Sequence, residues 1–167
     1  LIAGMDAIEQ ELAAAPRPGM KYLDLHVRAH VLIGDLLHRA GILKVSGETA
    51  VAKGLTRPFF PHGLGHLVGL GVRDASGYLP GRSRSKRPGL DMLRTDLPLE
   101  PGYVITVEPG IYFIPALLTD PVRRTKYADC VDWARVDGLL GFGGIRIEDD
   151  VLVTEGDPDV LTAACPK

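Results

Sequence analysis

Residues 59–74 read FFPHGLGHLVGLGVRD, an apolar stretch that carries two histidines and four glycines. His62 and His66 are four residues apart, so a helix or an extended strand would each place both on one face. A helix is disfavoured, because each interior glycine costs roughly 1 kcal/mol relative to alanine. We therefore expect an extended segment that aims both histidines in one direction and lets neighbouring backbone approach closely.

The spacing alone leaves the role of this pair open between a site and ordinary hydrogen bonding. A second pair, His26 and His30, has the same spacing but falls in a helix-patterned segment. For that pair, a partly buried or solvated helix face is a better interpretation than a ligand role.

The 167 residues are 46% hydrophobic and 24% charged, which is ordinary for one globular domain. The formal net charge of −2 gives no general basic field, so we expect no nucleic-acid partner. Basic residues do cluster in GRSRSKRPG, residues 81–89, where a solvated loop is expected. Cys130 and Cys165 form no metal knuckle, which favours reduced thiols in a cytoplasmic protein. No apolar run reaches the ~18 residues of a membrane span, so no membrane partner is expected.

Two helices are expected first. Residues 1–15 have helical periodicity, and residues 21–40 form a second helix that Gly41 ends. The apolar face of the first helix would hold Ile2, Met5, Ile8 and Leu12. Its acidic residues, placed around the rest, are Asp6, Glu9 and Glu11. The first pattern lacks an N-cap, so we expect that further residues precede it.

After Gly41 the sequence changes to short β-branched runs cut by glycine and proline, which is typical of strands. The expected strands are residues 42–45, the histidine–glycine stretch, and residues 103–107, 111–114, 145–147 and 151–153. Residues 117–140 are the least regular and leave room for a short helix. Helices followed by strands favour an α+β fold with a bent antiparallel sheet over a doubly wound parallel sheet.

Two glutamates directly follow strand patterns: Glu108 after residues 103–107, and Glu148 after Gly-Gly-Ile-Arg-Ile. A carboxylate at the end of a buried strand is costly unless a cation or a donor compensates it. Exposed strand ends, or pairing of Glu148 with Arg146, would also explain these residues. Adding His66 favours a metal site, because one imidazole and two carboxylates suit Mn²⁺, Fe²⁺, Co²⁺ or Zn²⁺.

Three segments in order, PHGLGHLVGLGVRD, LEPGYVITVEPGIYF and FGGIRIEDDVLV, closely resemble the metal-site motifs of the pita-bread (M24-type) metallopeptidases. That family includes aminopeptidase P, prolidase and methionine aminopeptidase. The sequences of these segments are most similar to those of the bacterial Xaa-Pro dipeptidases, or prolidases. The resemblance covers essentially the whole chain. It implies an α+β pita-bread fold, with a curved antiparallel sheet flanked by helices, and metal-dependent hydrolysis of Xaa-Pro dipeptides.

The resemblance also implies two divalent ions, usually Mn²⁺, with Co²⁺ or Zn²⁺ as alternatives, held by two aspartates, one histidine and two glutamates. The histidine ligand falls on His66 and the glutamates on Glu108 and Glu148, of which Glu148 would contact both ions. Glu108 would also carry a proton to the leaving nitrogen. His62 would act beside the path of the substrate.

Three further residues are expected to contact the substrate or to support the ligands: Arg73, Tyr112 and Arg146. Arg146 matches the family's arginine and would orient a ligand carboxylate. Arg73 stands where the family usually has histidine. Arginine cannot serve as a neutral proton carrier, although its planar fork can hold a carboxylate. We expect Arg73 to clamp a substrate carboxylate; the alternative is that it points away and leaves the enzyme less active.

The family's two aspartate ligands are not matched in residues 1–60, because Asp6, Asp24 and Asp35 all lie on helix patterns. Residues 1–167 are therefore expected to be the C-terminal part of a pita-bread catalytic domain, without the N-terminal domain and the first catalytic strands. Such a part would bind metal weakly and be inactive alone. Expected partners are a small peptide ending in proline, the N-terminal portion of the same protein, and a second copy in a homodimer. Alternatives are an aminopeptidase P-like peptidase, a creatinase-like hydrolase and a metal-free binding module.

Overall fold

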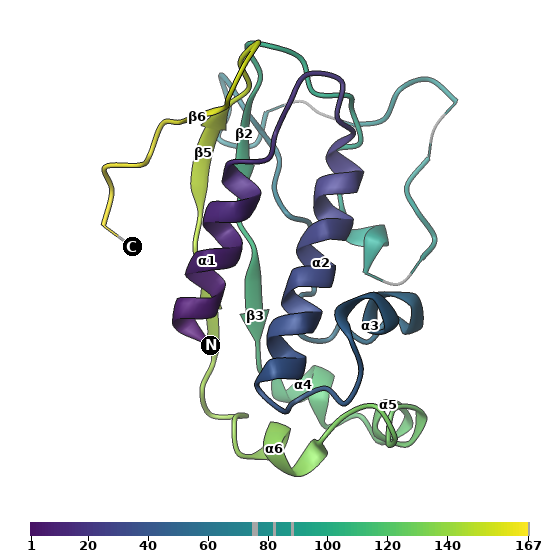
Figure 1. The fold of residues 1–167 in the computed structure, drawn as a ribbon. Helices are drawn as coiled ribbons and strands as arrows, with labels where there is room; N and C mark the ends of the chain where they lie inside the picture. Colours follow the sequence, from purple (N-terminus) through teal and green to yellow (C-terminus); the bar gives the residue numbers. More distant parts are fainter. Residues whose placement is uncertain (75–76, 82, 88, 167) are drawn as a thin grey trace.

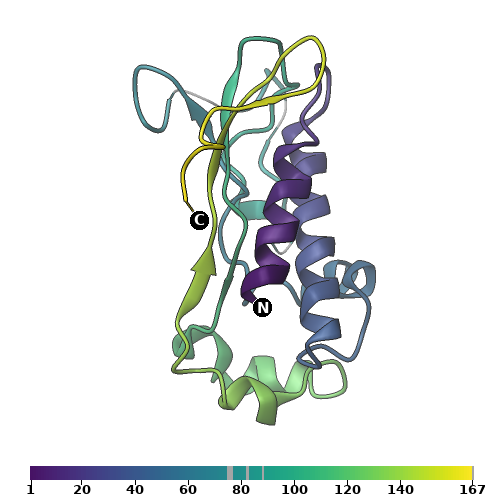
Figure 2. The same cartoon turned by 60° about the vertical axis from the view of Figure 1, so that its left-hand side comes forward.

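Two long helices cover one face of an antiparallel sheet in the computed structural model, which describes residues 1–74, 77–81, 83–87 and 89–166 (Figures 1 and 2). The helices are α1 (Ile2–Ala13) and α2 (Tyr22–Arg39). The main sheet has the order β1-β2-β5-β6, with strands Leu67–Val68, Val104–Val107, Asp149–Leu152 and Asp159–Val160. A second antiparallel pair joins β3 (Gly110–Tyr112) to β4 (Gly144–Arg146). The observed architecture confirms the α+β class.

Short helices surround one end of α2 (Figure 1). They are α3 (Gly47–Lys53), α4 (Pro115–Leu118), α5 (Pro121–Lys126) and α6 (Trp133–Asp137), and a 3₁₀ turn, η1, covers Leu90–Met92. Helix α3 was not predicted, although it has ordinary end signals: the Ser46 side chain accepts from the backbone N–H of Thr49, and Gly54 ends it in the left-handed conformation. None of the helices in the described ranges is long and apolar enough to cross a lipid bilayer.

The predicted helices are confirmed, but two features of their faces were wrong. Glu9 was placed outside the apolar face of α1, yet it is buried, because it lies four residues after Met5 on the stripe that packs inward. His26 and His30 were expected to be partly buried or solvated, and both are fully buried. Periodicity within α2 could not show this, because the covering residues come from distant segments.

The predicted strands at 103–107, 111–114, 145–147 and 151–153 correspond to β2, β3, β4 and β5, with boundaries shifted by at most two residues. The strand at 42–45 was wrong. Its backbone makes only the isolated bridge between Leu43 and Val131, so it pairs with a connecting segment and joins neither sheet. Residues 117–140 hold three short helices where one was expected.

Gly65 lies where the histidine–glycine stretch runs antiparallel beside β2, bonded through the backbone N–H groups of Thr106 and Glu108. A methyl group at this position would overlap the carbonyl oxygen of Thr106 and the hydroxyl of Tyr22. These two groups are themselves bonded, because the Tyr22 hydroxyl donates to the Thr106 carbonyl at 2.5 Å. Only a glycine fits at position 65 without displacing the backbone of β2 or the hydroxyl of Tyr22.

Gly65→Ala should therefore lower the free energy of unfolding by about 1–3 kcal/mol, the range for overpacking a close contact. The matched control is Gly71→Ala in the same segment, where the nearest atom would be the Arg73 carbonyl oxygen at an ordinary 3.5 Å. We expect the control to stay within about 0.5 kcal/mol of the parent protein. Urea unfolding of both variants measures the difference, and equal midpoints would contradict the crowding at Gly65.

The buried pair His26 and His30 makes folding sensitive to acid. His26 Nε2 donates to the Gly89 carbonyl at 3.0 Å, and the two rings lie edge to face, 4.6 Å apart. Burial lowers the pKa of His26 from 6.5 to about 4; the Gly89 bond and Asp91 raise this pKa, and His62 lowers it. Burial likewise lowers the pKa of His30 well below its ordinary value, with His26 adding to the shift.

Because the folded pKa lies below the unfolded one, the stability from a neutral His26 is complete above pH 6.5 and is lost as pH falls toward 4. Between pH 7.5 and 5, this residue alone should account for a loss on the order of 2 kcal/mol. His26→Gln should flatten that dependence in urea unfolding, whereas the exposed His38→Gln should not. Equal pH dependence in the two variants would contradict this assignment.

Candidate metal centre

The sheet register brings His66, Glu108 and Glu148 together. Val107 pairs with Asp149 across β2 and β5, so Glu108 and Glu148 are the next residues at the same end of that ladder. His66 precedes β1, and its carbonyl accepts from the backbone N–H of Thr106 at 2.9 Å. One ligand atom of each of the three predicted residues lies within 4.8 Å of the others.

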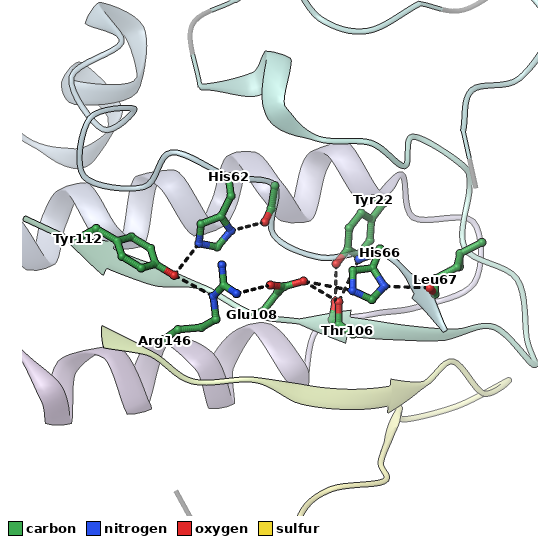
Figure 3. Close-up of polar contacts among 9 residues, drawn as sticks. Tyr22, His62, His66, Leu67, Thr106, Glu108, Tyr112 and Arg146 are labelled. Carbon is green, nitrogen blue, oxygen red and sulfur yellow. Dashed lines mark hydrogen bonds and ion pairs between the residues drawn. The ribbon is translucent and has the colours of Figure 1, made fainter. Parts of the chain in front are cut away.

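The ring of His66 is oriented as a ligand should be. Its Nδ1–H donates to the carbonyl oxygen of Leu67 at 2.9 Å, as Figure 3 shows. The Nε2 atom, which then carries the lone pair of a neutral ring, faces Glu108 Oε1 at 3.5 Å. A lone pair and a carboxylate oxygen attract each other only through a shared proton or cation, so this geometry fits a metal ion.

The two glutamates differ in solvent exposure, and their negative charges repel each other. Glu108 is buried and Glu148 is exposed. Desolvation raises the pKa of the Glu148 carboxyl, and the negative charge of Glu108 raises it further. A divalent cation between them would relieve this repulsion, and a set of one imidazole and two carboxylates suits Mn²⁺, Co²⁺ or Zn²⁺. No aspartate of the described ranges belongs to the group.

Both oxygens of Glu108 are held by donors. The Thr106 hydroxyl donates to Oε1 at 3.1 Å, and Arg146 Nη1 lies 3.3 Å from Oε2 (Figure 3). The alternative pairing of Arg146 with Glu148 is therefore not the ion pair formed. Thr106 was missed by sequence analysis, although its place two residues before Glu108 on one strand put both on the same face.

A second polar chain joins Arg146 to His62 through Tyr112. Arg146 Nε donates to the Tyr112 hydroxyl at 2.8 Å, and that hydroxyl lies 3.0 Å from His62 Nε2 (Figure 3). His62 Nδ1 donates to the Gly63 carbonyl at 2.8 Å, so Nε2 accepts the tyrosine proton. Burial lowers the pKa of His62, with a smaller contribution from the Arg146 charge, which favours this neutral ring.

Several of the predicted residues lie on one cavity of about 490 Å³, although Glu148 is not among the residues that line it. His62, His66, Arg73 and Glu108 line it directly. Tyr112 and Arg146 reach it through their bonds to His62 and Glu108.

Two basic residues of the cavity, Arg84 and Arg94, were missed by sequence analysis. Arg84 belongs to the segment 81–89, interpreted as a solvated loop. Its described residues up to 87 are mostly exposed, but Arg84 also faces the cavity. A basic residue in such a loop gives no sequence signal of this placement.

Comparisons with known proteins find peptidases that are similar to this chain. The chain is 47% identical over 165 residues to a Xaa-Pro dipeptidase of Stenotrophomonas maltophilia strain R551-3. It is 48% identical over 165 residues to a Xaa-Pro dipeptidase of Xanthomonas campestris pv. campestris strain 8004. Each alignment covers 97% of this chain and 37% of the relative, so the chain spans little more than a third of the length of those proteins.

Solved structures of aminopeptidase P share the fold. The Escherichia coli enzyme with the inhibitor Pro-Leu and proline aminopeptidase P II from Yersinia pestis each give a TM-score of 0.71 at 31% identity. Both alignments cover 99% of this chain and 31% of the other. These neighbours confirm the pita-bread fold that the motifs implied. The profile of metallopeptidase family M24 matches residues 2–155, and the chain belongs to that family.

Proposed function

We propose that the protein carrying this chain is a metal-dependent dipeptidase that hydrolyses Xaa-Pro dipeptides. The observation that carries the proposal is the approach of His66 Nε2 to Glu108 Oε1, 3.5 Å apart, with the Glu148 carboxylate beside them. Relatives named Xaa-Pro dipeptidase, at 47–48% identity, support the choice of substrate.

His66, Glu108 and Glu148 would hold divalent metal, with Mn²⁺ as the proposed ion. When bound, such ions polarise a scissile carbonyl and lower the pKa of a water molecule. Three ligands are too few for a pair of ions. We therefore propose that residues 1–167 are the C-terminal part of the catalytic domain and that two aspartate ligands come from the rest of the protein.

Within this chain, Glu108 is the proposed proton carrier, and Thr106 and Arg146 fix its two oxygens in place. The neutral His62, held by Tyr112, offers a polar group at the wall of the cavity where the substrate would lie. Arg73 lines the same cavity and is the proposed partner of the substrate carboxylate. Its position in the cavity favours this role over the alternative in which it points away.

An aminopeptidase P-like activity is the second candidate, because the structural neighbours cited above are aminopeptidases P, at TM-scores of 0.71. The two activities differ in the length of peptide that they accept. A homodimer and a cytoplasmic location also belong to the proposal; the free thiols of Cys130 and Cys165 agree with a reducing compartment.

The full-length protein with Mn²⁺ should hydrolyse Ala-Pro faster than Ala-Pro-Ala by at least roughly tenfold in kcat/KM. Glu148→Gln keeps the shape of the side chain but removes its charge, so bound metal and kcat should both fall, kcat by about 100-fold or more. The control is Glu155→Gln, an exposed glutamate that follows β5.

Elemental analysis of dialysed protein and single-substrate kinetics measure these effects. Faster cleavage of the tripeptide would favour an aminopeptidase P-like activity. Full metal content and activity in Glu148→Gln would rule out the proposed centre.

Tyr112→Phe removes the hydroxyl that links His62 to Arg146 and leaves the ring in place. We expect kcat to fall by about tenfold with unchanged metal content, because His62 loses its fixed orientation while the ligands remain. Steady-state kinetics on Ala-Pro together with metal analysis test this. A parallel loss of metal would instead assign Tyr112 to the support of the ligands.

A further inference from the structure

Three arginines line the cavity beside the candidate metal centre: Arg73, Arg84 and Arg94. No hydrogen bond or ion pair joins their guanidinium groups to the other described residues. The carboxylates on the same cavity are Asp74, which has a contact of its own, and Glu108, which Thr106 and Arg146 already hold. The three arginines therefore bring more positive charge to the cavity than the carboxylates that line it neutralise.

Two of the three arginines are placed near the proposed reaction. Arg73 lines the cavity together with His62. Arg94 directly follows Leu93, whose backbone packs against Gly63, next to His62. A dipeptide has one terminal carboxylate, and a single arginine can hold it through two parallel bonds. These two residues are sufficient for that group.

Arg84 is an exposed residue of the segment 83–87 that also lines the cavity, and its cation is in excess of what a dipeptide with an uncharged side chain needs. Like charges that share a cavity repel one another, and a second anion on the substrate would offset that repulsion. The volume of about 490 Å³ is within the usual range for small-molecule sites, so a dipeptide with a long acidic side chain can fit.

Resting on the proposed dipeptidase function, we propose that the enzyme prefers Xaa-Pro dipeptides whose first residue is acidic, and that Arg84 determines this preference. The Arg84 guanidinium binds the side-chain carboxylate of the substrate. Because such charge-assisted bonds at an open site are screened by salt, the preference is strongest at low ionic strength.

The test compares Glu-Pro with Gln-Pro, which differ only in the side-chain charge, using the full-length enzyme with Mn²⁺. We expect kcat/KM for Glu-Pro to exceed that for Gln-Pro by roughly tenfold, which corresponds to one charge-assisted bond at a partly exposed site. In Arg84→Gln this ratio should fall to about 1. The matched control is Arg87→Gln, an exposed arginine of the same segment that does not line the cavity, and it should keep the ratio.

Each outcome is decisive. Equal kcat/KM for the two dipeptides would overturn the acidic preference and leave the dipeptidase function intact. A preference that persists in Arg84→Gln, or that disappears equally in Arg87→Gln, would overturn the role of Arg84. Failure to hydrolyse either dipeptide, or any other Xaa-Pro dipeptide, would count against the proposed function itself.

Discussion

The close contact between Gly65 and the backbone of Thr106 is the constraint on which the candidate centre depends. It lets the histidine–glycine stretch lie directly on β2, so that the His66 backbone N–H donates to the Thr106 hydroxyl at 3.0 Å. The same hydroxyl donates to Glu108, which means that one threonine fixes the relative positions of two ligands. A side chain at position 65 would separate the segments and pull His66 away from Glu108.

The three candidate ligands could be predicted because each is a polar residue at a position where the local sequence pattern does not account for one. His66 stands in a glycine-rich stretch that neither helix nor core explains, and Glu108 and Glu148 end apolar strand patterns. Sequence patterns could not reveal the burial of His26 and His30, since Phe60 and Gly89 cover them from segments far along the chain. For the same reason, the position of Arg84 on the cavity depends on how a glycine- and proline-rich loop returns to the site.

The candidate centre has more negative charge and lone-pair donors than positive charge, and a bound cation would balance them. His66 presents a lone pair, and Glu108 and Glu148 present negative charge, while Arg146 is the cation that directly pairs with this group. Arg146 is not a substitute for metal, because it binds the oxygen of Glu108 that does not face His66. Its guanidinium holds the carboxylate in one orientation and leaves the other oxygen, with the imidazole, for an ion.

Side chains of both charges line the cavity: the carboxylates of Asp74 and Glu108, and the guanidinium groups of Arg73, Arg84 and Arg94. A dipeptide is itself polar, with an ammonium at one end and a carboxylate at the other. The ammonium would be attracted toward the carboxylates and repelled by Arg73 and Arg94, and the reverse holds for the terminal carboxylate. In the proposed dipeptidase, these charges would favour one orientation of the substrate, in which the terminal carboxylate faces Arg73 and Arg94. Arg73 strengthens this field, because arginine keeps its charge at every physiological pH.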